Sequence, residues 1–401
     1  MKFKLTKSNA YKLLAVLVSI GAVMVGLHYI LREIFFASRA RDITIPAQTI
    51  TVANPLLTTI YFNNIIGATG AVAQFEKSID SAQHSIEIAV FSIKSDRLRQ
   101  ALYRADARGV KVTLILDSSR ADQHNKAFPD LPKGIVRIDD GTYDAVNSKN
   151  TAYMHHKFML IDRGYPTQEL TQGSLNFTDL GEKYNESYFL TTSDATLIKI
   201  YGGEFDLLKK GVTSLGKLGN AEYDPWTARI QYPNGFLEVW MSPGFSNDSA
   251  KYRILELINS ATTSLDLMMW DFTDTKIAQA LVKKSEAGVH VRIVADNTNA
   301  TSSYSVLPTL MKAKEKEGLK NLEVILDTKS TALITGPVPD GFNPYLHEHS
   351  MIVDGKIAVF GTNNWSMWGF YHNDEDTLIT DNTYLVGQFE KTFDYFYTTL
   401  K

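Results

Sequence analysis

The sequence predicts an α/β protein, a duplicated α/β/α sandwich of two pseudo-symmetric lobes that share one site, with an N-terminal transmembrane helix in front of them. Three observations support this prediction. One block of sequence occurs twice at constant spacing, each copy alternates helix-like and strand-like stretches, and a long apolar run precedes both copies. Helices that alternate with buried strands are typical of layered α/β folds.

The apolar run is Leu13–Ile30, which carries no formal charge and is flanked by lysines and arginines. At 1.5 Å per residue it spans roughly 27 Å as a helix, enough for one bilayer crossing. We expect residues 1–41 to form a membrane anchor, with the body outside the cytoplasm because positive charge is denser before the run. A cleaved secretory signal is the main alternative, and a buried core helix is the third.

Composition narrows the remaining classes of protein. The chain has 401 residues, of which 44% are hydrophobic, so it can build two packed lobes. It contains no cysteine, which excludes disulfides and thiolate zinc sites. Residues 1–41 hold seven Lys or Arg and one acid, so residues 42–401 carry a net charge of −9. An acidic body argues against tight binding of long polynucleotides.

The repeated block covers Ile79–Asp117 and, without a gap, Ile258–Asp296, at an offset of 179 residues. Such dense identity indicates an internal duplication. We expect a largely parallel or mixed sheet in each lobe. The predicted strands are Ser85–Phe91, Val110–Asp117, Ser264–Trp270 and Val289–Asp296, and the predicted helices lie near Asp96–Arg108 and Thr275–Ala287.

The domain prediction follows from the duplication. We expect the first lobe at 42–216, a connector rich in Gly, Asn and Pro at 217–235, and the second lobe at 236–401. Residues 42–60 are predicted to be a β-rich spacer that leads out from the membrane.

Each lobe carries one copy of a histidine motif. The first copy contains His155, Lys157 and Asp162, whereas the second contains His347 and Asp354 with His349 where the lysine is expected. On a strand, residues two apart point to the same face, so His155 and Lys157 converge on one ligand. By the same alternation His349 points into the site and His156 points away from it. Asp162 and Asp354, at the ends of the strands, are predicted to be structural anchors.

Further polar residues follow both motifs in the same order. They are Ser174, Asn176, Asn185 and Glu186 in the first half, and Thr362, Asn364, Asn373, Asp374 and Glu375 in the second. From about Ala71 to the C-terminus the chain strongly resembles the phospholipase D superfamily, whose members carry two such motifs followed by Gly-Ser-x-Asn and Asn-Glu elements.

The resemblance implies two phospholipase D-like lobes with one shared active site at their interface. It also implies that one histidine attacks phosphorus to form a phosphohistidine while the other protonates the leaving alcohol. We assign His155 as the nucleophile and His347 as the acid. Lys157, Asn176 and Asn364 would stabilise the phosphate oxygens, Glu186 and Glu375 would orient the histidines, and His349, Ser174 and Thr362 would contact substrate.

The expected substrate is a phosphodiester in a phospholipid bilayer, with no cofactor, no metal and no obligate protein partner. A zinc site at His347 and His349, with Asp374 and Glu375, is a competing interpretation. A nuclease of the same superfamily and a degenerate module that binds lipid or phosphate without turnover are the functional alternatives. If His349 must be protonated to replace the lysine, activity is expected to favour mildly acidic pH, because an imidazole has an ordinary pKa near 6.5.

Overall fold

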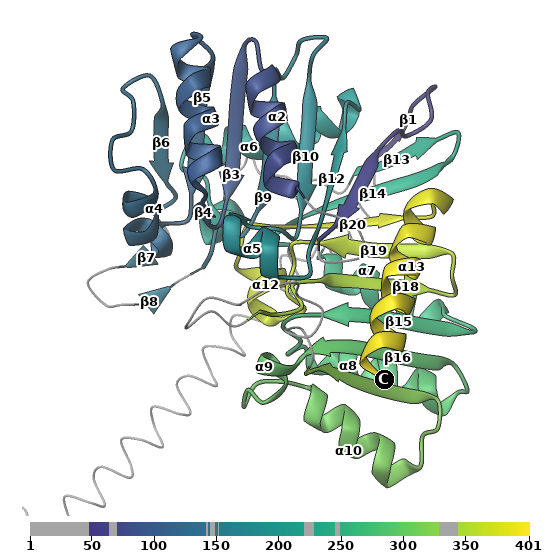
Figure 1. Ribbon diagram of the computed structural model, residues 1–401. Coiled ribbons are helices and arrows are strands. Elements are labelled where there is room, and N and C mark those ends of the chain that lie inside the picture. Colours follow the sequence, from purple (N-terminus) through teal and green to yellow (C-terminus); the bar gives the residue numbers. More distant parts are fainter. Residues whose placement is uncertain are drawn as a thin grey trace, which may run out of the picture. The chain divides into compact units, whose positions relative to one another are not determined.

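The computed structural model describes residues 48–63, 70–141, 143–144, 149–150, 152–219, 228–244, 249–328 and 344–401. The elements of its first half are β1 (Gln48–Thr51), β2 (Thr59–Phe62), α2 (Ala71–Ser81), β3 (Ser85–Val90), β4 (Ile93–Lys94), α3 (Asp96–Ala107), β5 (Lys111–Leu116), η1 (Ser118–Arg120), α4 (Ala121–Ala127), β6 (Val136–Asp139), β7 (Tyr143–Asp144), β8 (Lys149–Asn150), β9 (Lys157–Ile161), β10 (Glu169–Gly173), β11 (Phe177–Thr178), α5 (Asp179–Tyr184), β12 (Tyr188–Thr192), α6 (Ala195–Lys209) and η2 (Ser214–Gly219) (Figure 1).

The second half repeats much of this order. Its elements are β13 (Ala228–Tyr232), β14 (Gly235–Ser242), α7 (Ala250–Ser260), β15 (Ser264–Met269), α8 (Thr275–Glu286), β16 (His290–Asp296), α9 (Asn297–Ala300), α10 (Leu307–Glu317), β17 (Leu322–Asp327), β18 (His349–Val353), β19 (Ile357–Gly361), α12 (Met367–Tyr371), β20 (Glu375–Thr380) and α13 (Thr383–Leu400). No helix within the described ranges is long and apolar enough to cross a bilayer, and the anchor expected at residues 13–30 lies outside them.

The elements predicted in the repeated block agree with the structure to within one residue at each end. Two of its helices begin at capping residues, because the side chain of Ser95 accepts from the Leu98 N–H and that of Asp274 accepts from the N–H of Ile277. Apolar residues fill the strands between them, and all six residues of β15 are buried or half-buried. Strong periodicity and clear caps made this block legible in the sequence.

Each lobe contains one mixed sheet. The first has the order β2-β12-β10-β9-β3-β5-β6, and the corresponding strands of the second follow the order β14-β20-β19-β18-β15-β16-β17. In both, the repeated block supplies a parallel pair, β3 with β5 and β15 with β16. The histidine motif leads into the strand antiparallel to this pair, which is β9 in one lobe and β18 in the other. The two motifs therefore occupy equivalent places in their sheets.

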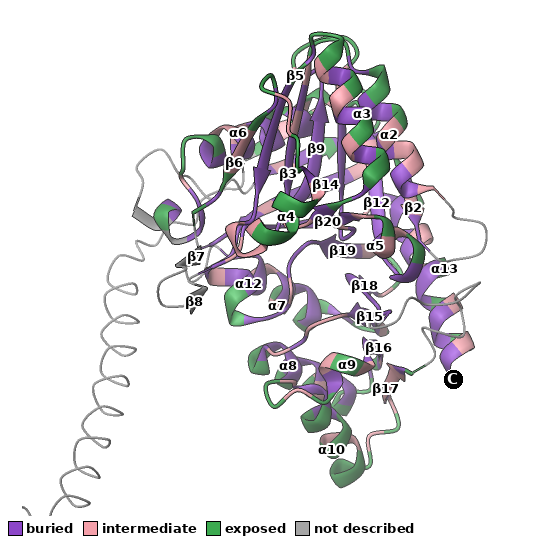
Figure 2. Ribbon diagram, turned by 60° about the vertical axis from the view of Figure 1, so that its left-hand side comes forward, coloured by how far each residue is buried: buried purple, intermediate pink, exposed green. Residues whose placement is uncertain are grey.

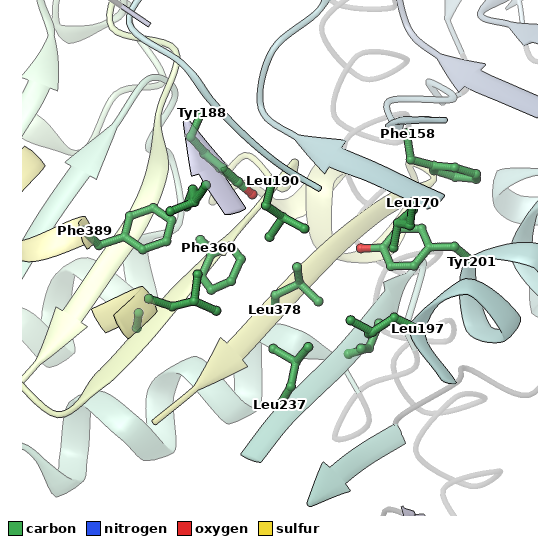
Figure 3. Close-up of a cluster of buried hydrophobic side chains, with 14 of the residues drawn as sticks. Phe158, Leu170, Tyr188, Leu190, Leu197, Tyr201, Leu237, Phe360, Leu378 and Phe389 are labelled. Carbon is green, nitrogen blue, oxygen red and sulfur yellow. The ribbon is translucent and has the colours of Figure 1, made fainter. Parts of the chain in front are cut away.

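Three hydrophobic clusters hold the layers together. One packs α2 and α3 on the first sheet and another packs α7, α8 and α10 on the second. The third combines residues of both sheets with α6 and α13, and Figure 3 shows its aromatic centre around Tyr188, Phe360 and Phe389. The rings of Tyr188 and Phe360 lie 5.7 Å apart although they belong to different lobes. In Figure 2 the strands are largely buried, whereas α2 and α3 carry exposed residues on their outer faces.

The first strand departs from the predicted domain boundaries. Residues 42–60 were expected to be a spacer before the first lobe, but β1 pairs in parallel with β13 at the edge of the second sheet. The expected connector at 217–235 likewise contains β13, a strand of that sheet. Strand pairing over 180 residues of sequence separation leaves no local pattern, which is why the sequence did not reveal it.

Gly173 tests how closely two strands of the first sheet approach. A β-carbon at Gly173 would lie 2.2 Å from the carbonyl oxygen of Tyr188, whereas one at Gly203 on α6 would meet nothing within 4 Å. We expect Gly173→Ala to lower the free energy of unfolding by about 1–3 kcal/mol. Gly203→Ala should leave it unchanged or raise it by up to about 1 kcal/mol. Urea denaturation of the two variants measures both values, and equal stabilities would contradict the close contact at Gly173.

Candidate active site

The two histidine motifs are joined by reciprocal backbone hydrogen bonds between the lobes. The His155 N–H donates to the carbonyl of Asp374 at 2.9 Å, and the Asp374 N–H donates to that of Tyr153 at 2.8 Å. In the same way the His347 N–H donates to the carbonyl of Glu186 at 2.7 Å. Each histidine is therefore placed by the segment that follows the Gly-x-x-Asn element of the opposite lobe.

This pairing changes which residues are equivalent in the two lobes. Because Glu186 and Asp374 make the same backbone contact, Glu186 corresponds to Asp374, and Ser187 corresponds to Glu375. Adjacent residues of an extended segment point to opposite faces. The prediction that Glu186 and Glu375 have equivalent roles is thus wrong by one residue.

His155 has a carboxylate partner from the opposite lobe. Its Nδ1 lies 2.7 Å from Oε2 of Glu375, and its ring packs edge to face on Phe91 at 4.9 Å. Burial lowers the pKa of His155 below its ordinary value, although the charge of Glu375 opposes that effect. A carboxylate accepts a hydrogen bond, so Nδ1 donates and Nε2 keeps the lone pair for a substrate.

His347 has no such partner. Burial, together with the charges of Lys157 and His155, lowers its pKa well below the ordinary value. Both carboxyl oxygens of Glu186 are buried without a hydrogen-bond partner among the described residues. Burial raises the pKa of Glu186 well above its ordinary value, so this side chain is held as a neutral acid that does not orient His347. At the position equivalent to Glu375, the buried hydroxyl of Ser187 also lacks a partner among the described residues.

Lys157 supplies the positive charge of the site. Its ammonium is buried, donates to the carbonyl of His155 at 2.6 Å and lies 5.7 Å from the centre of the Phe91 ring. Burial lowers the pKa of Lys157 to about 8, while Glu375 and Asp376 oppose that effect. Lys157 is therefore mostly charged at neutral pH.

His349 lies on the same side as His347, with ring centroids 5.3 Å apart, but does not replace the lysine charge. Neither of its ring nitrogens has a partner among the described residues. Burial lowers its pKa well below the ordinary value, and the charges of His347, His155 and Lys157 act in the same direction. The expectation that His349 titrates near its ordinary pKa is therefore wrong, because a desolvated imidazole beside a lysine stays neutral.

The hydroxyls predicted to contact substrate are also used inside the lobes. The Ser174 Oγ accepts from the Tyr188 N–H at 3.1 Å, and the Thr362 Oγ1 accepts from the Asp376 N–H at 3.0 Å. The amide oxygens of Asn176 and Asn364 are buried without a hydrogen-bond partner among the described residues. The two asparagines thus keep an acceptor free near the motifs.

The two motif aspartates bind backbone amides at the start of the adjacent strand. Asp162 accepts from the N–H groups of residues 83–85, and Asp354 accepts from those of residues 262–264. Burial would raise the pKa of both carboxyl groups, but the hydrogen bonds outweigh it and lower both pKa values. Both side chains have the geometry of anchors and lie away from the histidine rings.

A buried ionic network that the sequence did not reveal lies behind His155. The Nε2 of His156 lies 3.0 Å from Glu204, and Lys217 contacts Glu204 and lies 2.5 Å from Asp374. Burial alone would lower the pKa of His156, but Asp376 and Glu204 outweigh it and raise the pKa to about 9. Only the outward direction of His156 was predicted, since Glu204 and Lys217 lie outside both motifs. The network holds Asp374, whose backbone positions His155.

The same contacts bear on the zinc interpretation. Asp374 and Glu375 were considered as ligands beside His347 and His349, but they bind Lys217 and His155 instead. No group of three or more His, Asp or Glu residues in the described ranges is arranged to hold a metal ion.

Comparison with known proteins gives consistent matches. A family model described as "Cardiolipin synthase, PLD-like domain" matches residues 75–209 and 254–397, one stretch in each lobe. The mitochondrial cardiolipin hydrolase of Xenopus laevis is 29% identical over 147 residues, which cover 37% of this chain and 60% of that protein. A phospholipase D of Rickettsia conorii is 27% identical over 132 residues, which cover 33% of this chain and 60% of that protein.

A solved structure shows the same fold over most of the chain. The phosphatidylserine synthase of Haemophilus influenzae superposes with a TM-score of 0.56 and 16% identity, covering 84% of this chain and 87% of that one. The alignment with the two curated relatives spans 60% of their own length.

The different charge states of Lys157 and His349 can be tested by anion binding. We expect Lys157→Gln to weaken binding of inorganic phosphate by about tenfold or more, because a charged donor is lost. His349→Gln should change the affinity by less than about threefold, because one neutral polar side chain replaces another. Isothermal titration calorimetry at pH 7 measures both. Equal losses in the two variants would show that His349 carries a charge.

Proposed function

This chain belongs to the phospholipase D superfamily, and on that premise we propose that it is a membrane-anchored phosphodiesterase that hydrolyses or transfers phosphatidyl groups through a phosphohistidine. The family match extends over both lobes. The names of the relatives, cardiolipin hydrolase and phospholipase D, support a phospholipid substrate.

The observation that carries the proposal is the reciprocal pairing of the motif segments. It brings His155, with its Glu375 partner, and His347 to the junction of the lobes, where the charge of Lys157 acts on both. Two histidines with different partners can divide the work of nucleophile and acid.

In the proposed first step, Nε2 of His155 attacks phosphorus and the bond to the leaving alcohol oxygen breaks. The alcohol takes a proton from His347. Glu375 fixes the tautomer of His155 and offsets the positive charge that the ring gains when its Nε2 is phosphorylated. In the second step, neutral His347 takes a proton from water or an acceptor alcohol, whose oxygen displaces His155 from phosphorus. Lys157 stabilises the phosphate oxygens throughout.

The proposed acid must gain its proton together with the substrate. The pKa of His347 lies well below its ordinary value in the free site, and a bound phosphodiester anion raises the pKa of a nearby imidazole. An acidic preference therefore follows from His347, and not from His349 as the sequence suggested.

The two rims of the site support a lipid substrate. Equivalent short helices follow the asparagines, each capped by a hydroxyl, with Thr178 on α5 and Ser366 on α12. On α5 the exposed first position is Asp179, whereas α12 exposes Met367 and Trp368, at 45% and 42% of their surface. Exposed apolar and aromatic side chains of this kind are typical of membrane-interface contacts. The anchor expected at residues 13–30 would keep the site beside a bilayer.

The reaction can be tested with labelled vesicles and by trapping the intermediate. We expect the full chain to release headgroup or phosphatidate from phospholipid vesicles, and brief incubation with phosphorus-labelled lipid to leave acid-labile label on His155. His155→Ala should lose at least about a hundredfold in rate and all label. His290→Ala, at an exposed position on the edge of the second sheet, is the matched control and should behave as wild type. Label on His347 would reverse the two roles. Cleavage of single-stranded DNA without lipid turnover would indicate the nuclease alternative, and phosphate binding without turnover the degenerate module.

The pH dependence separates the groups. Since His347 must be protonated and its pKa is lowered, kcat/KM should rise as pH falls from 8 to 6. Above about pH 8, Lys157 also loses its proton, so the decline should steepen there. Lys157→Arg should remove the steepening, because arginine stays charged. A profile flattened by His349→Gln would contradict the assignment of the acidic preference to His347.

A further inference from the structure

A groove of about 660 Å³ opens on the first lobe beside the histidine site. Asn176 and Tyr345 line it at the end nearest the site, and the Tyr345 ring lies 5.3 Å from that of His347. Away from the site, the lining includes Lys94, Arg120 and Lys126. The groove therefore connects the position of the reacting phosphate with a group of cations.

Arg120 is the cation nearest the histidines. Its guanidinium carbon lies 4.8 Å from the centre of the Phe91 ring, and the same ring contacts His155 at 4.9 Å. Arg120 and His155 thus flank one aromatic side chain. No carboxylate of the described residues lies within ion-pair distance of Arg120, although the side chain is half-buried. A guanidinium in this position is available to an anion that enters the groove.

The remaining charges of the groove also favour an anion. Lys94 and Lys126 are exposed, and the opposing carboxylates in the lining are Asp96 and Asp179. Asp96 already pairs with Arg99 at 3.1 Å, on the far side of α3's first turn. Three cations consequently face one carboxylate that is not engaged by Arg99.

The second lobe lacks this feature. Asp117 and Asp296 are equivalent in the duplication, so the position of Arg120 is occupied there by Asn299. In both lobes this residue belongs to a short helical turn that follows the aspartate, η1 in the first and α9 in the second. The duplicated scaffold therefore presents a cation on one side of the shared site only.

We propose that Arg120, supported by Lys94 and Lys126, binds a second phosphate of the substrate while the first lies between His155 and His347. The inference rests on the proposed function and specifies its substrate class. That class is a phospholipid whose headgroup contains two phosphodiesters joined by a short polyol, as in diphosphatidylglycerol. A guanidinium binds a phosphate through two parallel N–H donors, which makes Arg120 a selective contact.

The test compares two lipids that differ in the second phosphate. In mixed vesicles of constant surface charge, Arg120→Gln in the full chain should lower kcat/KM for diphosphatidylglycerol by about tenfold or more. The same variant should change kcat/KM for phosphatidylglycerol, which has one phosphate, by less than about twofold. Arg104→Gln is the matched control, because Arg104 is half-exposed on α3 and pairs with Asp80 outside the groove. It should leave both substrates unaffected, and Arg120→Lys should retain part of the preference.

Equal losses on the two lipids, or no loss on either, would overturn the proposal. If an oligonucleotide rather than diphosphatidylglycerol requires Arg120, the groove holds a nucleic-acid strand and the proposal is again wrong. If the wild-type chain hydrolyses neither lipid, the proposed function fails, and thermal unfolding then tests the subsite by itself. Pyrophosphate should raise the melting temperature of the wild type more than phosphate does, and Arg120→Gln should abolish that difference. An unchanged difference would exclude the subsite.

Discussion

The site depends on the crossed backbone pairing of the two lobes. The amide of His155 reaches Asp374, and that of His347 reaches Glu186, so neither histidine is placed by its own lobe alone. Buried backbone groups need partners, and here each lobe satisfies the other's. The apolar cluster around Tyr188, Phe360 and Phe389 holds the strands that carry these segments. Separation of the lobes would therefore expose that cluster and dismantle the site together.

A symmetric scaffold supports an asymmetric site. One histidine has the carboxylate of Glu375, while the equivalent position facing the other histidine holds Ser187. The single buried ammonium, Lys157, comes from the first lobe, and His349 is neutral in the second. A two-step reaction needs a nucleophile and an acid with different properties, and duplication within one chain allows the two copies to diverge. Two identical subunits could not carry such a difference.

The sequence predicted the duplicated block, its strands and helices, and the meeting of the two motifs, because periodicity and spacing are local properties. It misassigned Glu186, since a shift of one residue in an extended segment reverses its face and no pattern distinguishes Glu186-Ser187 from Asp374-Glu375. It did not find Lys217 or Glu204, which lie outside both motifs and meet only in the folded chain. The low pKa of His349 depends on burial, which the sequence does not state.

The edge strand β1 has a consequence for synthesis of the chain. It emerges from the ribosome first, yet its partner β13 follows about 180 residues later. At roughly 5–20 residues per second, that delay is about 10–40 seconds. Throughout this time β1 presents unpaired backbone groups, and the first sheet can fold without it. Vectorial folding can therefore complete the first sheet early, but the second closes only when the chain returns to its own beginning.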